Sequence, residues 1–195
     1  MIIRLRRQQV KATDKQFFIA EDLPRKVDEA NVKKEKKAGN LKVVWISRIA
    51  PKKNLKYAIE ILEETKSDIE FTIYGPAHTE EYWKECKQEL RKLPSNVKWE
   101  WKGNLDSESV VETLKHYHVF LFPTLGENFG HVIQEALSAG CPCIISDQTP
   151  WRDFESQGVG YVFSLENKSA FVNAVEKYAV MKQEEFQNAV EKAHQ

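Results

Sequence analysis

Residues 122–137 read FPTLGENFGHVIQEAL and predict, in order, the end of a strand, a turn and a helix. The apolar run Val119 to Phe122 is typical of a buried strand, and the residues from Pro123 to Asn128 have turn chemistry. From Gly130 to Ala139 apolar residues recur at helical spacing, and the helix is expected to end at Gly140. This stretch therefore predicts one repeating unit of an α/β fold.

Two glutamates of this stretch are candidates for binding hydroxyl groups. Glu127 is expected in the loop before the helix and Glu135 inside it, so that roughly 12 Å of helical rise separates them. The free N–H groups at the start of the helix lie at the positive end of its dipole and favour an anion between the two carboxylates. The pattern predicts a site for a nucleotide diphosphate sugar. The alternative is a solvated glutamate pair around an ordinary strand, turn and helix.

A second strand and loop supply positive charge. Residues 41–47, LKVVWIS, predict a buried strand that runs into RIAPKKN at 48–54 and then into an amphipathic helix. In an open parallel sheet, ligands bind at the carboxyl ends of the strands, where Arg48 and Lys53 are placed. Arginine offers phosphate oxygens a planar fork and lysine a mobile charge, so together they can neutralise a diphosphate. The alternative is that both cations are solvated, as we expect for Lys52.

Strands and helices alternate along the rest of the chain, which predicts parallel pairing. We expect residues 41–195 to form one Rossmann-like nucleotide-sugar-binding domain, an α/β parallel sheet flanked by helices, and residues 1–40 to be a connector with a short strand at 16–20. The remaining expected strands are 70–75, 97–103, 143–146 and 158–163, and the remaining expected helices are 80–93, 107–117 with Asp106 as its cap, 168–178 and 184–194.

Four segments together resemble a known family. They are SRIAPKKN at 47–54, IYG at 73–75, WKG at 101–103 and the stretch from residue 122 to Ile144. In order and spacing they are similar to the carboxy-terminal, donor-binding domain of the group 1 retaining glycosyltransferases. These enzymes have the GT-B fold of two Rossmann-like domains. The resemblance, which runs from residue 41 to the end of the chain, implies one half of that two-domain architecture.

The resemblance also implies roles for individual residues. Arg48 and Lys53 are expected to bind the donor diphosphate. Glu127, the first glutamate of an E-x7-E motif, is expected to contact the transferred sugar, and the second glutamate, Glu135, the ribose. The main chain at Lys102 and Gly103 is expected near the base. The other residues expected to bind the donor are Gly75, Asn128, Phe129, Gly130 and His131.

By the same resemblance, the intact enzyme transfers a sugar from a UDP-sugar or GDP-sugar donor to a glycan or lipid-linked acceptor, with retention of configuration. Its candidate catalytic residues are Arg48, Lys53 and Glu127, and neither a metal ion nor another cofactor is expected. The amino-terminal GT-B domain, which carries the acceptor site, is missing from this sequence. We therefore expect the chain alone to be inactive, and to be an excised half rather than a subunit that works with a separate partner.

Two other classes of protein stay open on the sequence. One is a non-catalytic nucleotide-binding or assembly module, against which the combination of two cations and two glutamates argues. The other is a different GT-B enzyme, such as a nucleotide-sugar epimerase. A dinucleotide oxidoreductase is disfavoured, because no G-x-G-x-x-G motif opens a helix after a strand.

Charge and hydropathy restrict the partners. Lys and Arg number 29, as do Asp and Glu, and this zero net charge argues against nucleic acid. No apolar run approaches the roughly 20 residues that cross a bilayer, which predicts a cytoplasmic protein. Early arginines would favour peripheral association with the inner face of the membrane if the acceptor is lipid-linked, although a solvated linker is the favoured interpretation. The cysteines Cys86, Cys141 and Cys143 are expected in the core.

Two aromatic segments give further expectations. Trp99 and Trp101 alternate with charged residues on an expected strand, and we predict that both pack in the core rather than stack on a sugar. Residues 151–153, WRD, either close over the donor or form a structural turn, and the sequence does not separate these alternatives.

Overall fold

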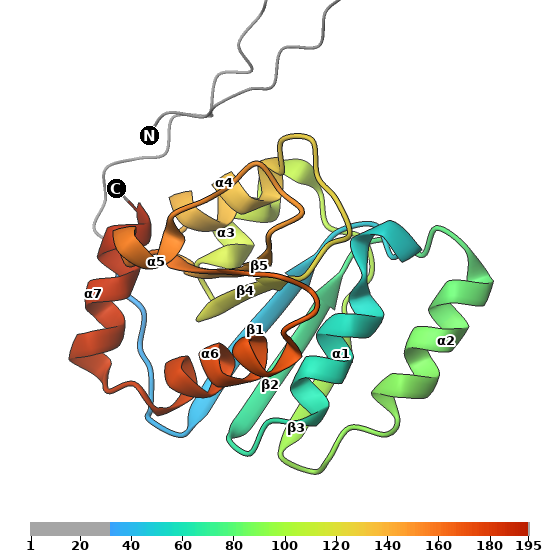
Figure 1. Cartoon of the computed structure of the whole chain (residues 1–195), viewed down its shortest axis with the longest axis horizontal. Coiled ribbons are helices and arrows are strands. Elements are labelled where there is room, and N and C mark those ends of the chain that lie inside the picture. Colours follow the sequence, from blue (N-terminus) through green and yellow to red (C-terminus); the bar gives the residue numbers. More distant parts are fainter. Residues whose placement is uncertain (1–31, 195) are drawn as a thin grey trace, which may run out of the picture.

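The computed structural model describes residues 32–194 as a six-stranded sheet with helices on both faces (Figure 1). The expected strand at 16–20 and the early arginines lie outside the described residues. The strands are β1 (Asn40–Ile46), β2 (Asp68–Tyr74), β3 (Val97–Trp101), β4 (Val119–Phe122), β5 (Cys143–Ser146) and β6 (Gly160–Phe163). The helices are α1 (Leu55–Glu63), α2 (Glu80–Leu90), α3 (Val110–Leu114), α4 (His131–Ser138), α5 (Phe154–Gln157), α6 (Lys168–Val180) and α7 (Gln183–His194), with 3-10 turns η1 (Pro51–Lys53) and η2 (Ser107–Ser109).

All six strands are parallel and their order is β3-β2-β1-β4-β5-β6. The order reverses between β1 and β4, which pair through Val43 with Val119 and Val44 with Phe120. Helices α1, α2 and α6 cover one face, while α3 and α4 pack together on the other (Figure 1). The predicted Rossmann-like fold is confirmed.

The core follows the central strands. Every residue of β4 and β5 is buried, as expected for parallel strands that are covered on both faces. The three cysteines predicted in the core are buried and free. The predicted packing of Trp99 and Trp101 in the core is wrong, because β3 is the outermost strand and its indoles are 38% and 41% exposed. Trp101 is covered on one side only, with its ring centroid 4.9 Å from that of Trp83.

The expected helix at 107–117 is shorter than predicted. A single 3-10 turn, η2, precedes the five-residue helix α3, and the side chain of Asp106 makes no capping hydrogen bond. The segment contains two serines and adjacent valines, which favour the helix weakly. Asp106 occupies the N-cap position of η2, as predicted, but without a side-chain hydrogen bond to the helix.

Residues 32–37, which we call the strap, run along the domain before β1 and insert two lysines into it. Lys34 Nζ donates hydrogen bonds to the carbonyls of Leu114 (3.0 Å) and Tyr117 (2.7 Å), at the end of α3. Lys36 Nζ donates to Ala179 (2.7 Å) and Met181 (3.2 Å), at the end of α6. A helix carboxyl end has free carbonyls and a partial negative charge, so both ammonium groups stabilise helix ends.

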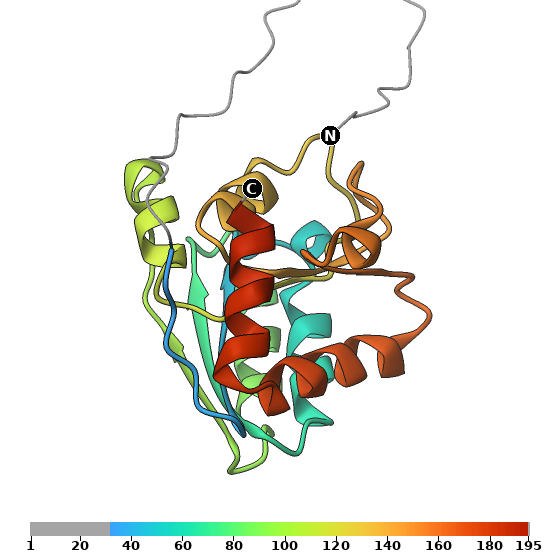
Figure 2. The ribbon, with the colours of Figure 1, turned by 90° about the vertical axis from the view of Figure 1, so that its left-hand side faces the viewer.

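Helix α7 lies beside the strap and binds it through hydrogen bonds (Figure 2). The amide of Gln183 accepts from the Lys36 N–H (2.6 Å) and donates to the Lys34 carbonyl (2.8 Å). One turn later, the Gln187 amide accepts from the Lys34 N–H (3.3 Å) and donates to the Val32 carbonyl (2.9 Å). Two glutamines of α7 thereby satisfy strap backbone groups as a neighbouring strand would. Part of the predicted connector thus packs on the domain.

His118 joins the strap to β1. Its Nδ1 accepts the Lys42 backbone N–H (2.9 Å), so its Nε2 carries the proton and donates to the Glu35 carbonyl (2.9 Å). Burial lowers the pKa of His118 to about 4, and the nearby cations Lys36, Lys34 and Lys42 act in the same direction. The imidazole is therefore neutral in the folded protein at neutral pH.

Acid is expected to destabilise the domain through His118. Its folded pKa lies below the value of about 6.5 in an unfolded chain, so the unfolded state binds more protons between these limits. The contribution is complete above about pH 6.5 and is lost as the pH falls towards 4, by roughly 3 kcal/mol in full. Urea unfolding at pH 7 and pH 5 should show a smaller loss of stability in His118→Gln than in the wild type. An equal loss in both would contradict this assignment.

Candidate functional site

The candidate site lies where the strand order reverses, at the carboxyl ends of β1 and β4. Two loops meet there: residues 47–54, which we call the β1 loop, and residues 123–130, the β4 loop. In an open parallel sheet the crevice beside such a reversal is where ligands bind. Each loop carries residues that the sequence identified as candidates.

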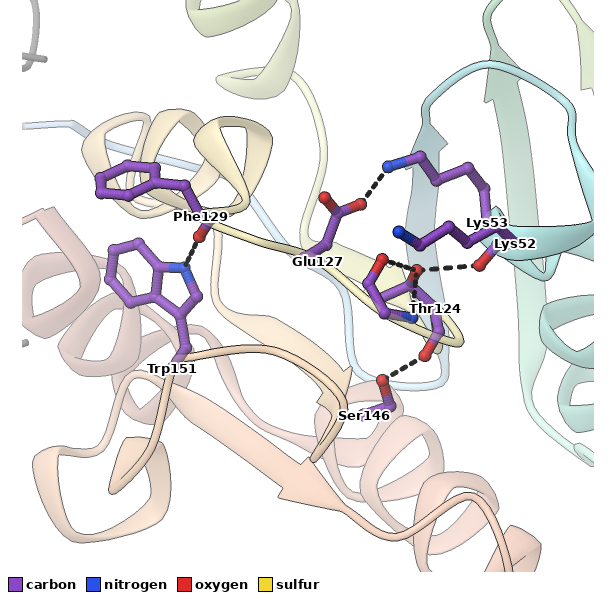
Figure 3. Close-up of polar contacts among 8 residues, drawn as sticks. Lys52, Lys53, Thr124, Glu127, Phe129, Ser146 and Trp151 are labelled. Atoms are coloured by element: carbon purple, nitrogen blue, oxygen red, sulfur yellow. Dashed lines mark hydrogen bonds and ion pairs between the residues drawn. The ribbon is translucent and has the colours of Figure 1, made fainter. Parts of the chain in front are cut away.

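Lys53 of the β1 loop and Glu127 of the β4 loop form an ion pair, Nζ to Oε1 (Figure 3). The two residues are 74 positions apart in the sequence. Their side chains are 18% and 14% exposed, so solvent screens this pair less than it screens a surface pair. The Lys53 ammonium also lies 5.8 Å from the ring centroid of the buried Phe122. A cation and a carboxylate predicted from separate segments are thereby brought together.

Helix α4 begins at His131, directly after the β4 loop. Gly130 at its N-cap has a φ of 80°, and a Cβ there would lie 2.9 Å from Ile133 Cδ1, so the position favours glycine. Having no side chain, Gly130 leaves the amino end of the helix without a side-chain cap. Glu135 is half-buried within α4, as predicted, and Glu127 lies before it.

The end of the β4 loop rests on Trp151. The indole N–H donates to the Phe129 carbonyl at 2.7 Å, and the ring is 4% exposed (Figure 3). The ring of Phe129 lies 4.5 Å from that of His131. Arg152 donates to the carbonyls of Thr149, Trp151 and Asp147. Residues 151–153 therefore form a structural turn in this structure, the second of the two alternatives that the sequence left open.

The ends of β2 and β3 bring two further candidates together. The Gly75 N–H donates to the Gly103 carbonyl (2.7 Å), and the Trp101 indole donates to the Gly75 carbonyl (3.1 Å). Pro76, which lacks an N–H, contributes its carbonyl, which accepts the Ile49 N–H of the β1 loop (2.9 Å). Three strand ends are thus joined by their main chains.

The remaining candidates are more exposed. Arg48 and Asn128 are exposed on their loops, and the Lys102 ammonium pairs with Glu100 on the sheet at 3.0 Å. Residues 32–194 hold no group of three or more His, Cys, Asp or Glu side chains that could bind a metal ion. No helix in this part of the chain is long and apolar enough to cross a membrane.

Sequence reasoning missed two residues that join the loops, Asn54 and Thr124. Asn54 adopts a φ of 57° and its side-chain N–H donates to the Pro123 carbonyl at 2.9 Å. Asparagine before an apolar helix could have signalled such a left-handed position. Thr124 is wholly buried, and its neighbours in sequence gave no sign of the loop that it contacts.

The parallel sheet, its reversal between β1 and β4 and its helices on both faces define one Rossmann-like half of a GT-B glycosyltransferase fold. Solved structures share it: the lipopolysaccharide outer core galactosyltransferase WaaB has a TM-score of 0.66 at 19% identity, over 86% of this chain and 49% of that one. Anabaena Alr3699/HepE, solved with UDP-glucose, has a TM-score of 0.66 at 20% identity, over 80% of this chain and 43% of that one.

The chain belongs to the group 1 glycosyl transferases, whose family model matches residues 26–195. A Caenorhabditis elegans protein, GDP-Man:Man(3)GlcNAc(2)-PP-Dol alpha-1,2-mannosyltransferase, is 26% identical over an alignment of 137 residues that covers 63% of this chain and 29% of the relative. The chain thus spans less than a third of this relative and about half of the solved structures. This coverage is consistent with the carboxy-terminal domain that the sequence indicated.

Substituting Gly75 should be costly, because a Cβ there would lie 1.7 Å from the Ser47 carbonyl oxygen and its φ is 127°. We expect Gly75→Ala to lower the free energy of unfolding by about 3 kcal/mol or more, measured by urea unfolding. Gly103→Ala is the matched control, since its φ is 72° but no atom lies within 4 Å of the added carbon. It should cost about 1 kcal/mol. Equal losses in the two variants would refute the steric argument.

Proposed function

We propose that this chain is the donor-binding domain of a retaining glycosyltransferase and holds a UDP-sugar or a GDP-sugar. In the intact enzyme, the hexose passes to a glycan or lipid-linked acceptor without a metal ion, and a second, amino-terminal domain supplies the acceptor site. The observation that carries this proposal is the ion pair of Lys53 with Glu127 across the point where the strand order reverses.

The ion pair of Lys53 with Glu127 suits a site in which the donor diphosphate replaces the Glu127 carboxylate as the partner of Lys53. Without donor, Lys53 and Glu127 neutralise each other. A diphosphate placed beside Lys53, Arg48 and the amino end of α4 replaces the carboxylate with a stronger anion. Glu127 is then released to accept hydrogen bonds from hydroxyls of the sugar. One event thereby engages the leaving group and orients the group to be transferred.

The same charges act on the reaction step. When the bond between the anomeric carbon and the phosphate oxygen breaks, the nucleoside diphosphate gains negative charge. We propose that Arg48, Lys53 and the N–H groups at the start of α4 stabilise that charge, which favours the transition state over the bound donor. In this proposal they take the part of a divalent cation, and Glu127 is an orienting group rather than a nucleophile.

We propose that the nucleoside part of the donor contacts Glu135 and the loop that follows β3. Glu135, half-buried in α4, binds ribose hydroxyls. The main chain at Lys102 and Gly103, whose carbonyl accepts the Gly75 N–H, lies near the base. Both bases have support: the solved relative from Anabaena holds UDP-glucose, and the name of the worm relative includes GDP-Man. The PP-Dol in that name supports a lipid-linked acceptor.

Arg48→Ala should weaken binding of UDP or GDP by about 1.5–3 kcal/mol, the range for a hydrogen bond to a charged group, and leave uridine or guanosine binding unchanged.

Glu135→Ala should weaken binding of the nucleotide and of the nucleoside alike, because it removes a contact to the ribose. Calorimetric titration with and without magnesium measures both effects, and wild-type binding should not require the metal. Equal affinities of the wild type and both variants for every ligand would sink the proposal.

Lys53→Met should lower the affinity for UDP or GDP about 10- to 100-fold, since a charged partner of the diphosphate is lost. Lys52→Met is the matched control, because it removes the same charge from the neighbouring, exposed position. We expect it to change the affinity less than about threefold. If the two variants weakened binding equally, the effect would be one of general charge rather than of the proposed site.

A further inference from the structure

The spacing of the two loops at the candidate site must be held by something other than Lys53 and Glu127. The side chains that would contact the donor lie on separate loops, and neither loop belongs to a regular element along its whole length. A binding site needs its groups within about 0.5 Å of the productive geometry, which packing and hydrogen bonds behind them must maintain. This inference rests on the proposed function.

Thr124 belongs to the β4 loop and faces the β1 loop, and its hydroxyl is wholly buried (Figure 3). Its Oγ1 lies 3.0 Å from the Lys52 carbonyl and 3.3 Å from the Gly126 carbonyl, and it accepts the Gly126 N–H at 3.2 Å. A hydroxyl has a single proton, and the shorter contact assigns it to Lys52. The hydroxyl therefore joins the residue before Lys53 to the residue before Glu127.

The backbone around Thr124 strengthens the same connection. The Leu125 N–H donates to the Lys52 carbonyl at 2.9 Å, so this oxygen accepts two bonds from the β4 loop. Ser146, buried at the end of β5, donates its hydroxyl to the Thr124 carbonyl at 2.5 Å. Thr124 is thus fixed to the sheet on one side and to the β1 loop on the other.

We propose that Thr124 is a positioning residue, whose hydroxyl sets the distance between Lys53 and Glu127 and thereby prepares both for the donor. The side chain is enclosed by protein, so it acts through the two loops and not on the ligand itself. A valine in its place keeps the shape but leaves the Gly126 N–H without this acceptor and the Lys52 carbonyl with one donor fewer.

The first test needs no ligand. The coupling free energy between Lys53 and Glu127 is measured by urea unfolding of Lys53→Met, Glu127→Gln and the double variant. We expect this coupling to fall towards zero in a Thr124→Val background and to persist with Thr124→Ser, which restores the hydroxyl. A coupling that Thr124→Val leaves unchanged would overturn the proposal. If Thr124→Val is too unstable to purify, Thr124→Cys, a poorer donor, takes its place.

The second test uses UDP and GDP with uridine and guanosine as references. Thr124→Val should lower the affinity for the better-bound diphosphate about 3- to 10-fold, without weakening the corresponding nucleoside, and Thr124→Ser should restore it. Thr65→Val is the matched control, because it removes another buried hydroxyl, one that donates to the Leu62 carbonyl at the end of α1 rather than to either loop. A purely structural role would lower stability in both valine variants and leave the ratio of diphosphate to nucleoside affinity unchanged.

The two tests separate the possible failures. If the wild type binds neither UDP nor GDP, the proposed donor site is refuted, whereas the coupling measurement still decides whether Thr124 positions the pair. If the wild type binds a diphosphate and Thr124→Val binds it equally well, the donor site stands and the role of Thr124 is refuted.

Discussion

The structure depends on one constraint, the reversal of strand order between β1 and β4 in a sheet whose strands all run the same way. Because the strands are parallel, their carboxyl ends lie on one edge of the sheet, and the reversal places the loops that follow β1 and β4 next to each other. Lys53 and Glu127 meet there although 74 positions separate them. The chemistry of the site is thus a consequence of topology, and neither segment produces it alone.

Mutual neutralisation of Lys53 and Glu127 also shapes what the site can bind. A half-buried charge without a partner is unfavourable, so the empty domain keeps both groups paired and ordered. A ligand must replace the bond that it breaks, and its affinity is the difference between the two interactions. A strong anion that also presents hydroxyls to Glu127 satisfies both partners, whereas a neutral sugar would leave the ammonium unpaired. In the proposed function, the pair therefore favours ligands that combine phosphate and sugar.

The local sequence pattern was sufficient to predict much of the fold and part of the candidate site. Alternating apolar runs predicted the parallel sheet, and turn chemistry placed Glu127 in a loop. Strand order is not a local property, however, and this is why the exposed position of Trp99 on an edge strand was missed. The contact made by the Thr124 hydroxyl was missed for a similar reason, since the carbonyl that it contacts belongs to Lys52, 72 positions earlier. Contacts between segments that are distant in the sequence could not be predicted from local pattern.

The contacts of the strap show that the domain begins before its first strand, β1. Residues 32–37 supply the ammonium groups that bind the carboxyl ends of α3 and α6, and the carbonyl that accepts a hydrogen bond from His118 Nε2. A module exchanged between related enzymes at residue 40 would leave those helix ends and the two glutamines of α7 facing water. A junction that keeps the strap with the domain preserves these contacts, and the family match, which begins at residue 26, includes the whole strap.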